Sequence, residues 1–216
     1  MDLLFIDKII SGMKNKHSNG KMIKEALFYK ETLDNLLEDL LASRPEDIRF
    51  ENQLIGCHKS IIEAARESNP LNGSINNGVN HASMTLIMCK HLIGQGYDVV
   101  AERATFKKPR IRPDIFYKKD GITGIVEVEN ASVPAKPISR NGITPEDYQE
   151  DRFISKAARY SCYADEFLFA VSETPFPNPW LTGPIFRYLV KSKSERMPIE
   201  TKTFVEKVNY LYQHPH

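Results

Sequence analysis

The sequence predicts an α/β protein, in which an N-terminal α-helical region precedes a mixed sheet built in the order α-β-β-β-α-β and flanked by helices. Three observations carry this prediction. Apolar residues recur at helical spacing between residues 21 and 42. The short turn Lys119-Asp120-Gly121 joins two segments rich in strand-forming residues. An apolar run at 166–172 follows a segment with helix-start signals, which is typical of a buried strand parallel to its neighbour.

The first part of the chain is expected to be helical, with helices at 21–42 and 48–67. The following run at 69–78 contains many asparagine, glycine and proline residues, which favour turns over regular structure. We therefore expect an N-terminal α-helical region at 1–78 and a sheet-bearing domain at 79–216.

The second part is expected to begin with a helix at 82–92, for which Asn80 is a candidate N-cap and Gly94 and Gly96 are stop signals. Strands are predicted at 97–106, 114–118 and 124–129. Thr144-Pro145-Glu146-Asp147 combines a capping hydroxyl, an N1 proline and first-turn acids, and predicts a helix from 145 to about 162. A C-terminal helical extension is expected at about 200–212.

Composition restricts the class of protein. The chain has 216 residues, a net charge of +1, and three cysteines that form no metal-binding or disulfide spacing. Apolar segments are too short to cross a membrane. We therefore expect a protein with no membrane partner, located in the reducing cytoplasm.

Positive charge is concentrated near a single acid, Asp114. The basic residues of this patch are Arg103, Lys107, Lys108, Arg110 and Arg112, followed by Lys118 and Lys119. Clustered basic residues bind the phosphates of nucleic acids, although such a run is by default a solvated loop. The first five are our candidate nucleic-acid-binding residues.

Acidic residues lie on the predicted hairpin. Strand side chains alternate, so Glu127 and Glu129 share one face, and hairpin pairing brings Asp114 beside them. Converging carboxylates repel one another, and a hard cation such as Mg²⁺ or Mn²⁺ relieves this repulsion. An E-x-E pair alone more often marks a solvent face, so the prediction depends on the whole arrangement.

These residues resemble the PD-(D/E)XK nuclease superfamily, which has the restriction-endonuclease-like fold. Arg112-Pro113-Asp114 is similar to its "PD" element, and Glu127-Val128-Glu129 lies where the family has an acid, a spacer and a lysine. The resemblance covers about residues 80–172. The general layout is most similar to the archaeal Holliday-junction resolvase branch. The chain also resembles a crenarchaeal virus protein of the superfamily. That resemblance would imply that the protein is located in the cytoplasm of a host cell.

The resemblance implies roles for individual residues. Asp114, Glu127 and the backbone carbonyl of Val128 would be metal ligands. Glu129 replaces the family's lysine, and it would ligate a second cation or orient the attacking water. Lys156, on the predicted helix with Arg152 and Arg159, is a candidate substitute cation, although it also fits an exposed helical stripe. His81 and Glu102 are secondary candidates for a further acid or ligand.

The leading functional hypothesis is a metal-dependent endonuclease that hydrolyses DNA phosphodiester bonds, for example in branched or flapped DNA. Cutting two strands commonly needs two sites, so a homodimer is expected. Two alternatives stay open. One is a catalytically inactive nucleic-acid-binding protein on the same fold. The other is a protein-interaction module whose charged loop is only soluble surface.

Overall fold

The computed structural model describes residues 19–44, 46–68, 75–102, 112–129, 153, 156–157 and 159–171. Some predictions lie outside these residues. They are the end of the first strand, the beginning of the helix expected from residue 145, and the C-terminal helical extension. The basic residues Arg103, Lys107, Lys108 and Arg110, as well as Arg152, also lie outside the described residues.

The chain folds as an α/β protein and divides into two compact units, Met1–Arg103 and Ala104–His216. This division differs from the separation at 78/79 that the sequence suggests. In the structure, the helix that contains residue 78 and the strand that follows this helix pack with the N-terminal helices. In the described residues, the first unit therefore contains helices and a strand, and the second unit contains the hairpin with Asp114, Glu127 and Glu129.

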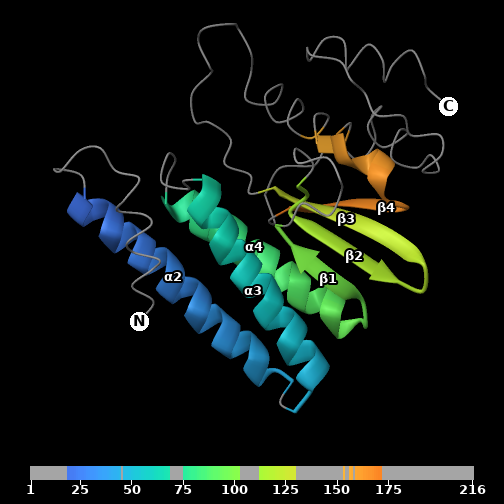
Figure 1. Ribbon diagram of the computed structural model, residues 1–216, viewed down its shortest axis with the longest axis horizontal. Helices are drawn as coiled ribbons and strands as arrows, with labels where there is room; N and C mark the ends of the chain where they lie inside the picture. The colour runs from blue at the N-terminus through green and yellow to red at the C-terminus, as the bar shows by residue number, and fades with distance from the viewer. Residues whose placement is uncertain are drawn as a thin grey trace, which may run out of the picture. The chain divides into compact units, whose positions relative to one another are not determined.

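Within the described residues the first unit contains three helices, and Figure 1 shows them lying alongside one another. They are α2 (Asn19–Ala42), α3 (Ile48–Ser68) and α4 (Ile75–Gly94). Both N-terminal helices predicted from apolar periodicity are confirmed. Asp47 caps α3, since its Oδ1 accepts a hydrogen bond of 3.0 Å from the Phe50 amide. Leu33 of α2, Leu54 of α3 and Leu86 of α4 are fully buried, so the three helices share one apolar core.

The beginning of α4 corrects the sequence prediction. The helix starts at Ile75, so Asn80 lies inside it, and the prediction that Asn80 is an N-cap is wrong. Val79, Ala82 and Leu86 are buried at helical spacing, which continues the apolar stripe into the segment rich in asparagine. Packing of this stripe outweighs the weak local preference of asparagine and glycine for turns.

Strand β1 (Asp98–Ala101) follows α4 and lies within the first strand predicted from the sequence. Two side chains of α3 hydrogen-bond to its backbone. The Gln53 Oε1 accepts from the Val99 amide at 3.1 Å, and the Cys57 thiol donates to the Val99 carbonyl at 3.7 Å. The strand stops at Glu102, whose φ of 50° lies in the left-handed region and is incompatible with strand geometry.

The second unit contains a β-hairpin of β2 (Ile115–Lys119) and β3 (Ile122–Glu129). The strands pair antiparallel, with Ile115 opposite Val126 and Lys119 opposite Ile122. The two-residue turn has φ of 50° at Asp120 and 85° at Gly121. Positive φ at both central residues is the geometry that suits the twist of a tight hairpin, and Asp-Gly favours it. The predicted hairpin is confirmed.

Strand β4 (Glu166–Val171) pairs with β3 in parallel, as predicted, so the sheet of this unit is mixed. Residues 153, 156, 157, 159 and 160 are helical, and a 3₁₀ turn at Ser161–Tyr163 leads into β4. The Asp165 carboxylate ties this entry to β3 by accepting hydrogen bonds from the Thr123 amide and hydroxyl at 2.9 and 2.7 Å. Crossing from β3 to β4 through a helix is the usual way to connect parallel strands.

In the part of the chain that the structure describes, every helix is too short or too polar to cross a lipid bilayer. Cys57, Cys89 and Cys162 all lie in the described part of the chain and form no disulfide there, and Cys57 and Cys89 are buried.

Candidate functional site

The hairpin brings Asp114 against Glu127. Asp114 directly precedes β2, and continuation of the Ile115–Val126 register places it opposite Glu127. Its amide donates a hydrogen bond of 3.3 Å to Glu127 Oε1, and its own Oδ2 accepts one of 2.7 Å from the Val128 amide. The Asp114 carboxylate is therefore fixed to the backbone of β3, beside the Glu127 carboxylate.

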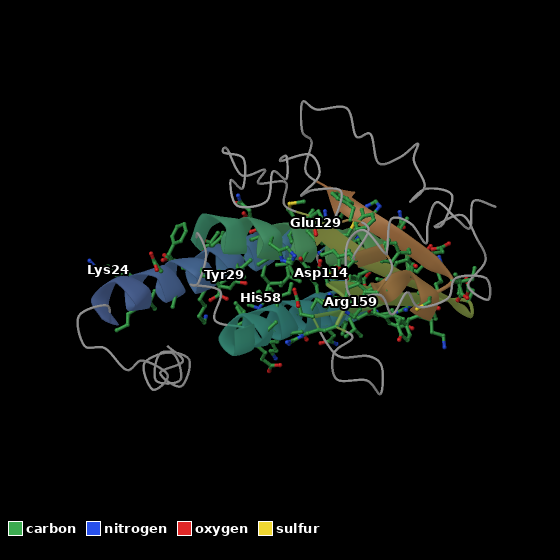
Figure 2. All side chains as sticks on the ribbon, turned by 90° about the horizontal axis from the view of Figure 1, so that it is seen from above. Lys24, Tyr29, His58, Asp114, Glu129 and Arg159 are labelled. Atoms are coloured by element: carbon green, nitrogen blue, oxygen red, sulfur yellow. The ribbon has the colours of Figure 1, made fainter. Side chains whose placement is uncertain are left out.

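Lys156 lies among the carboxylates. Its Nζ is 2.9 Å from Glu127 Oε2, 2.7 Å from Glu129 Oε1 and 3.4 Å from Asp114 Oδ2. The same atom is 3.4 Å from the Val128 carbonyl oxygen. We call Asp114, Glu127, Glu129 and Lys156 the acidic cluster. All four belong to the second unit, and Figure 2 labels Asp114 and Glu129 among its side chains.

Burial sets the electrostatics of the acidic cluster. Glu127 and Glu129 are only 2% and 3% exposed. A buried charge is costly unless it is paired, and the single ammonium of Lys156 contacts all three carboxylates. With every group ionised, the cluster carries a formal charge of −2. One further divalent cation would neutralise it.

The pKa values of the cluster follow from this environment. Burial, together with the neighbouring Asp114 charge, raises the pKa of Glu127 to about 8, although Lys156 acts in the opposite direction. Burial alone would lower the pKa of Lys156, but the carboxylates of Asp114, Glu127 and Glu129 outweigh burial and raise it. Lys156 thus stays positive, while Glu127 exchanges its proton near neutral pH.

The helix that carries Lys156 makes a second contact with this region. Tyr160 lies four residues after Lys156, one helical turn along the same face. Its hydroxyl donates a hydrogen bond of 3.3 Å to the Arg112 carbonyl, two residues before Asp114. Sequence patterns favour ordinary packing for Tyr160, so it was not among the predicted site residues. The spacing of four from Lys156 was the available signal.

Two other sequence candidates belong to the first unit, since His81 is on α4 and Glu102 follows β1. The Glu102 charge acts on groups of that unit, since it adds to burial in raising the pKa of Tyr29 and of Cys89. Of the five candidate nucleic-acid-binding residues, the described part of the chain includes Arg112, which is half-buried.

The donor set fits a hard divalent cation. Asp114, Glu127 and the Val128 carbonyl offer only oxygen atoms, which Mg²⁺ and Mn²⁺ prefer. Comparison of the chain with models of protein families, with curated proteins and with solved structures found no match. Any functional assignment therefore depends on the chemistry of these residues.

Proposed function

We propose that the protein is a metal-dependent endonuclease that hydrolyses DNA phosphodiester bonds, on a restriction-endonuclease-like core. The observation that supports the proposal is the convergence of Asp114, Glu127 and Glu129 around Lys156 Nζ at distances of 2.7 to 3.4 Å. Carboxylates and a lysine on a hairpin and the following helix are the groups that the PD-(D/E)XK resemblance implies for phosphodiester hydrolysis.

In this proposal Asp114, Glu127 and the Val128 carbonyl would hold Mg²⁺ or Mn²⁺. When bound there, such a cation would supply Lewis acidity toward a phosphate oxygen and would lower the pKa of a water. The charge of the cluster favours such a cation, because one ammonium leaves the buried carboxylates with an excess of negative charge. The hydrogen bond from the Val128 amide holds the Asp114 carboxylate in place for this role.

Lys156 supplies the positive charge of the family's lysine, whose position in this chain is occupied by Glu129. Its ammonium reaches the cluster from a helix rather than from β3, and it remains protonated because three carboxylates surround it. A positive charge at this place stabilises charge that develops on a phosphate during hydrolysis. Glu129, 2.7 Å from the ammonium, orients Lys156 and the attacking water.

The substrate side of the proposal is DNA bound by basic residues that precede Asp114 in the chain. Arg112 is two residues from Asp114, and the patch that begins at Arg103 precedes it in the chain. Basic side chains beside a metal centre would hold the phosphate backbone near the reacting bond. A homodimer would present two such sites to the two strands of DNA.

The proposal is tested by cleavage of labelled duplex, single-stranded, flap and four-way-junction DNA with Mg²⁺, Mn²⁺ or EDTA. We expect metal-dependent cutting that Asp114→Asn and Glu127→Gln each reduce by at least about a hundredfold, as loss of a group that acts on the transition state does. Glu166→Gln is the matched control, since this carboxylate pairs with Tyr117 outside the cluster. Intact DNA under all conditions would refute the endonuclease.

One observation favours a second candidate function. Glu129 stands where the family has its lysine, and the loss of that lysine would convert a nuclease into a nucleic-acid-binding protein. This alternative predicts binding of DNA that weakens steeply with salt, without cleavage by any metal. The same DNA panel, read by gel shift at two salt concentrations, separates the two functions.

A further inference from the structure

Tyr160 is tied to the acidic cluster by its place on the helix. Lys156 and Tyr160 are four residues apart, so both side chains leave the same face of the helix. Lys156 reaches the carboxylates, and Tyr160 reaches the Arg112 carbonyl, with its hydroxyl 3.3 Å away. One helix face therefore contacts both the carboxylates and the backbone that leads to Asp114.

The backbone between these contacts is stiff. Pro113 is fully buried, its ring fixes φ, and it restricts Arg112 to extended conformations. A hydrogen bond to the Arg112 carbonyl consequently fixes the orientation of the Arg112–Pro113 peptide. Asp114 follows directly, and its carboxylate accepts the 2.7 Å hydrogen bond from the Val128 amide. The segment is held at both ends, upstream by Tyr160 and downstream by β3.

The surroundings of Tyr160 keep the hydroxyl in this role. The side chain is only 6% exposed. Burial and the nearby charge of Glu127 raise the pKa of Tyr160, so the hydroxyl keeps its proton and donates it in the hydrogen bond. The Arg159 guanidinium lies 5.7 Å from the centre of the tyrosine ring, which limits movement of the ring; Figure 2 labels Arg159.

We propose that Tyr160 is a positioning residue, whose hydroxyl holds the Arg112–Pro113 peptide and thereby sets where the Asp114 carboxylate lies in the acidic cluster. The effect of Tyr160 on metal binding rests on the proposed function, whereas its effect on Asp114 does not. Removal of the hydroxyl alone is expected to let the Arg112–Pro113 peptide rotate. This rotation would weaken the hydrogen bond that the Val128 amide donates to the Asp114 carboxylate.

The test uses Tyr160→Phe in the full-length chain, with Tyr117→Phe as the matched control. Tyr117 also donates a hydroxyl hydrogen bond, to Glu166 Oε2 at 2.7 Å, but it does so from the middle of β2, opposite Gly124, and its partner is outside the acidic cluster. Each variant loses one hydroxyl and one hydrogen bond from the second unit. A merely structural role of Tyr160 would give both variants the same effects.

The first measurement needs no metal. Amide NMR spectra should show that Tyr160→Phe shifts the Val128 and Asp114 resonances and speeds hydrogen exchange at Val128, whereas Tyr117→Phe leaves both resonances in place. Unchanged Val128 and Asp114 amides in Tyr160→Phe would overturn the inference, whatever the metal measurements show. Shifted amides in a protein that binds no metal would uphold the positioning role and count against the nuclease.

The second measurement is the affinity for Mn²⁺, read by calorimetry on the two variants and the wild type. A residue that orients a metal ligand typically changes affinity by about ten- to a hundredfold, and we expect Tyr160→Phe to weaken Mn²⁺ binding by about tenfold. Tyr117→Phe should bind as the wild type does. Equal Mn²⁺ affinity in the wild type and Tyr160→Phe would overturn the effect of positioning on the metal site.

Discussion

Replacement of Lys156 by methionine removes the ammonium that contacts all three carboxylates of the acidic cluster. The ammonium makes contacts of 2.7, 2.9 and 3.4 Å with Glu129, Glu127 and Asp114. Each contact is worth about 5 to 6 kcal/mol of gross attraction at an effective dielectric constant near 20. Desolvation of the ions cancels most of this attraction, so the net value is far smaller.

The expected loss follows from what the variant leaves behind. Removing one partner of a buried ion pair costs about 3 to 5 kcal/mol, because the other charge stays buried and unpaired. Because the Lys156 side chain is 22% exposed, we expect a cost toward the lower end of this range. We therefore expect Lys156→Met to lower the free energy of unfolding of the second unit by about 3 kcal/mol at pH 8.

The loss should depend on pH. Without the ammonium, proton uptake neutralises part of the carboxylate charge, and Glu127 already has a raised pKa. Each proton taken up on folding stabilises the fold by up to about 1.4 kcal/mol per pH unit below the folded-state pKa. Glu127 already has a raised pKa in the wild type, so most of this gain is common to both proteins. The destabilisation of Lys156→Met should therefore be smaller at pH 6 than at pH 8, by less than about 0.5 kcal/mol.

The assay is urea unfolding followed by hydrogen exchange in peptides that contain β3, since these report on the second unit alone. Lys118→Met is the control, because Lys118 is an exposed lysine on β2 of the same unit. Exposed ion pairs contribute at most about 1 kcal/mol, so the control should change little. Equal unfolding free energies for Lys156→Met and Lys118→Met, at both pH values, would refute the reasoning.

Two further predictions concern the same hairpin. Burial raises the pKa of Glu127 to about 8. Between the ordinary pKa of a glutamate and about 8, the folded state therefore binds more protons than the unfolded state. The stabilisation from Glu127 is complete at acidic pH and is lost as the pH rises through this window. Glu127→Gln should remove this slope, at most about 1.4 kcal/mol per pH unit, from urea-unfolding data; an unchanged slope would contradict the pKa shift. Gly124→Ala would place a Cβ 1.9 Å from the Tyr117 ring, and since that ring is buried, overpacking should cost about 3 kcal/mol; an unchanged thermal midpoint would disprove the close approach.

Much of the fold was predictable because the interactions that determine it are local. Apolar periodicity located α2 and α3 to within two residues, and the Asp120-Gly121 turn located the hairpin. Hairpin register then implies that Asp114 faces Glu127, and strand alternation implies that Glu127 and Glu129 share a face. The proximity of the three acids was therefore within reach of the sequence, while their catalytic role stays a prediction.

Other features were decided by contacts between residues far apart in the chain. Sequence patterns alone favour a linker at 69–78, but packing of Val79 and Leu86 extends α4 back to Ile75. The division into units follows the packing of α4 and β1 with α2 and α3, which no local signal reports.

The chain by itself thus determined its α/β class, its hairpin and the position of its acids, since turn chemistry and side-chain periodicity act over a few residues. Only the tertiary structure decided that Lys156 Nζ lies 2.9 Å from Glu127, and that the Tyr160 hydroxyl reaches the Arg112 carbonyl. Both contacts span more than 25 residues, and they depend on how the helix packs against the sheet. Burial of the carboxylates has the same origin, and it is burial that raises the pKa of Glu127.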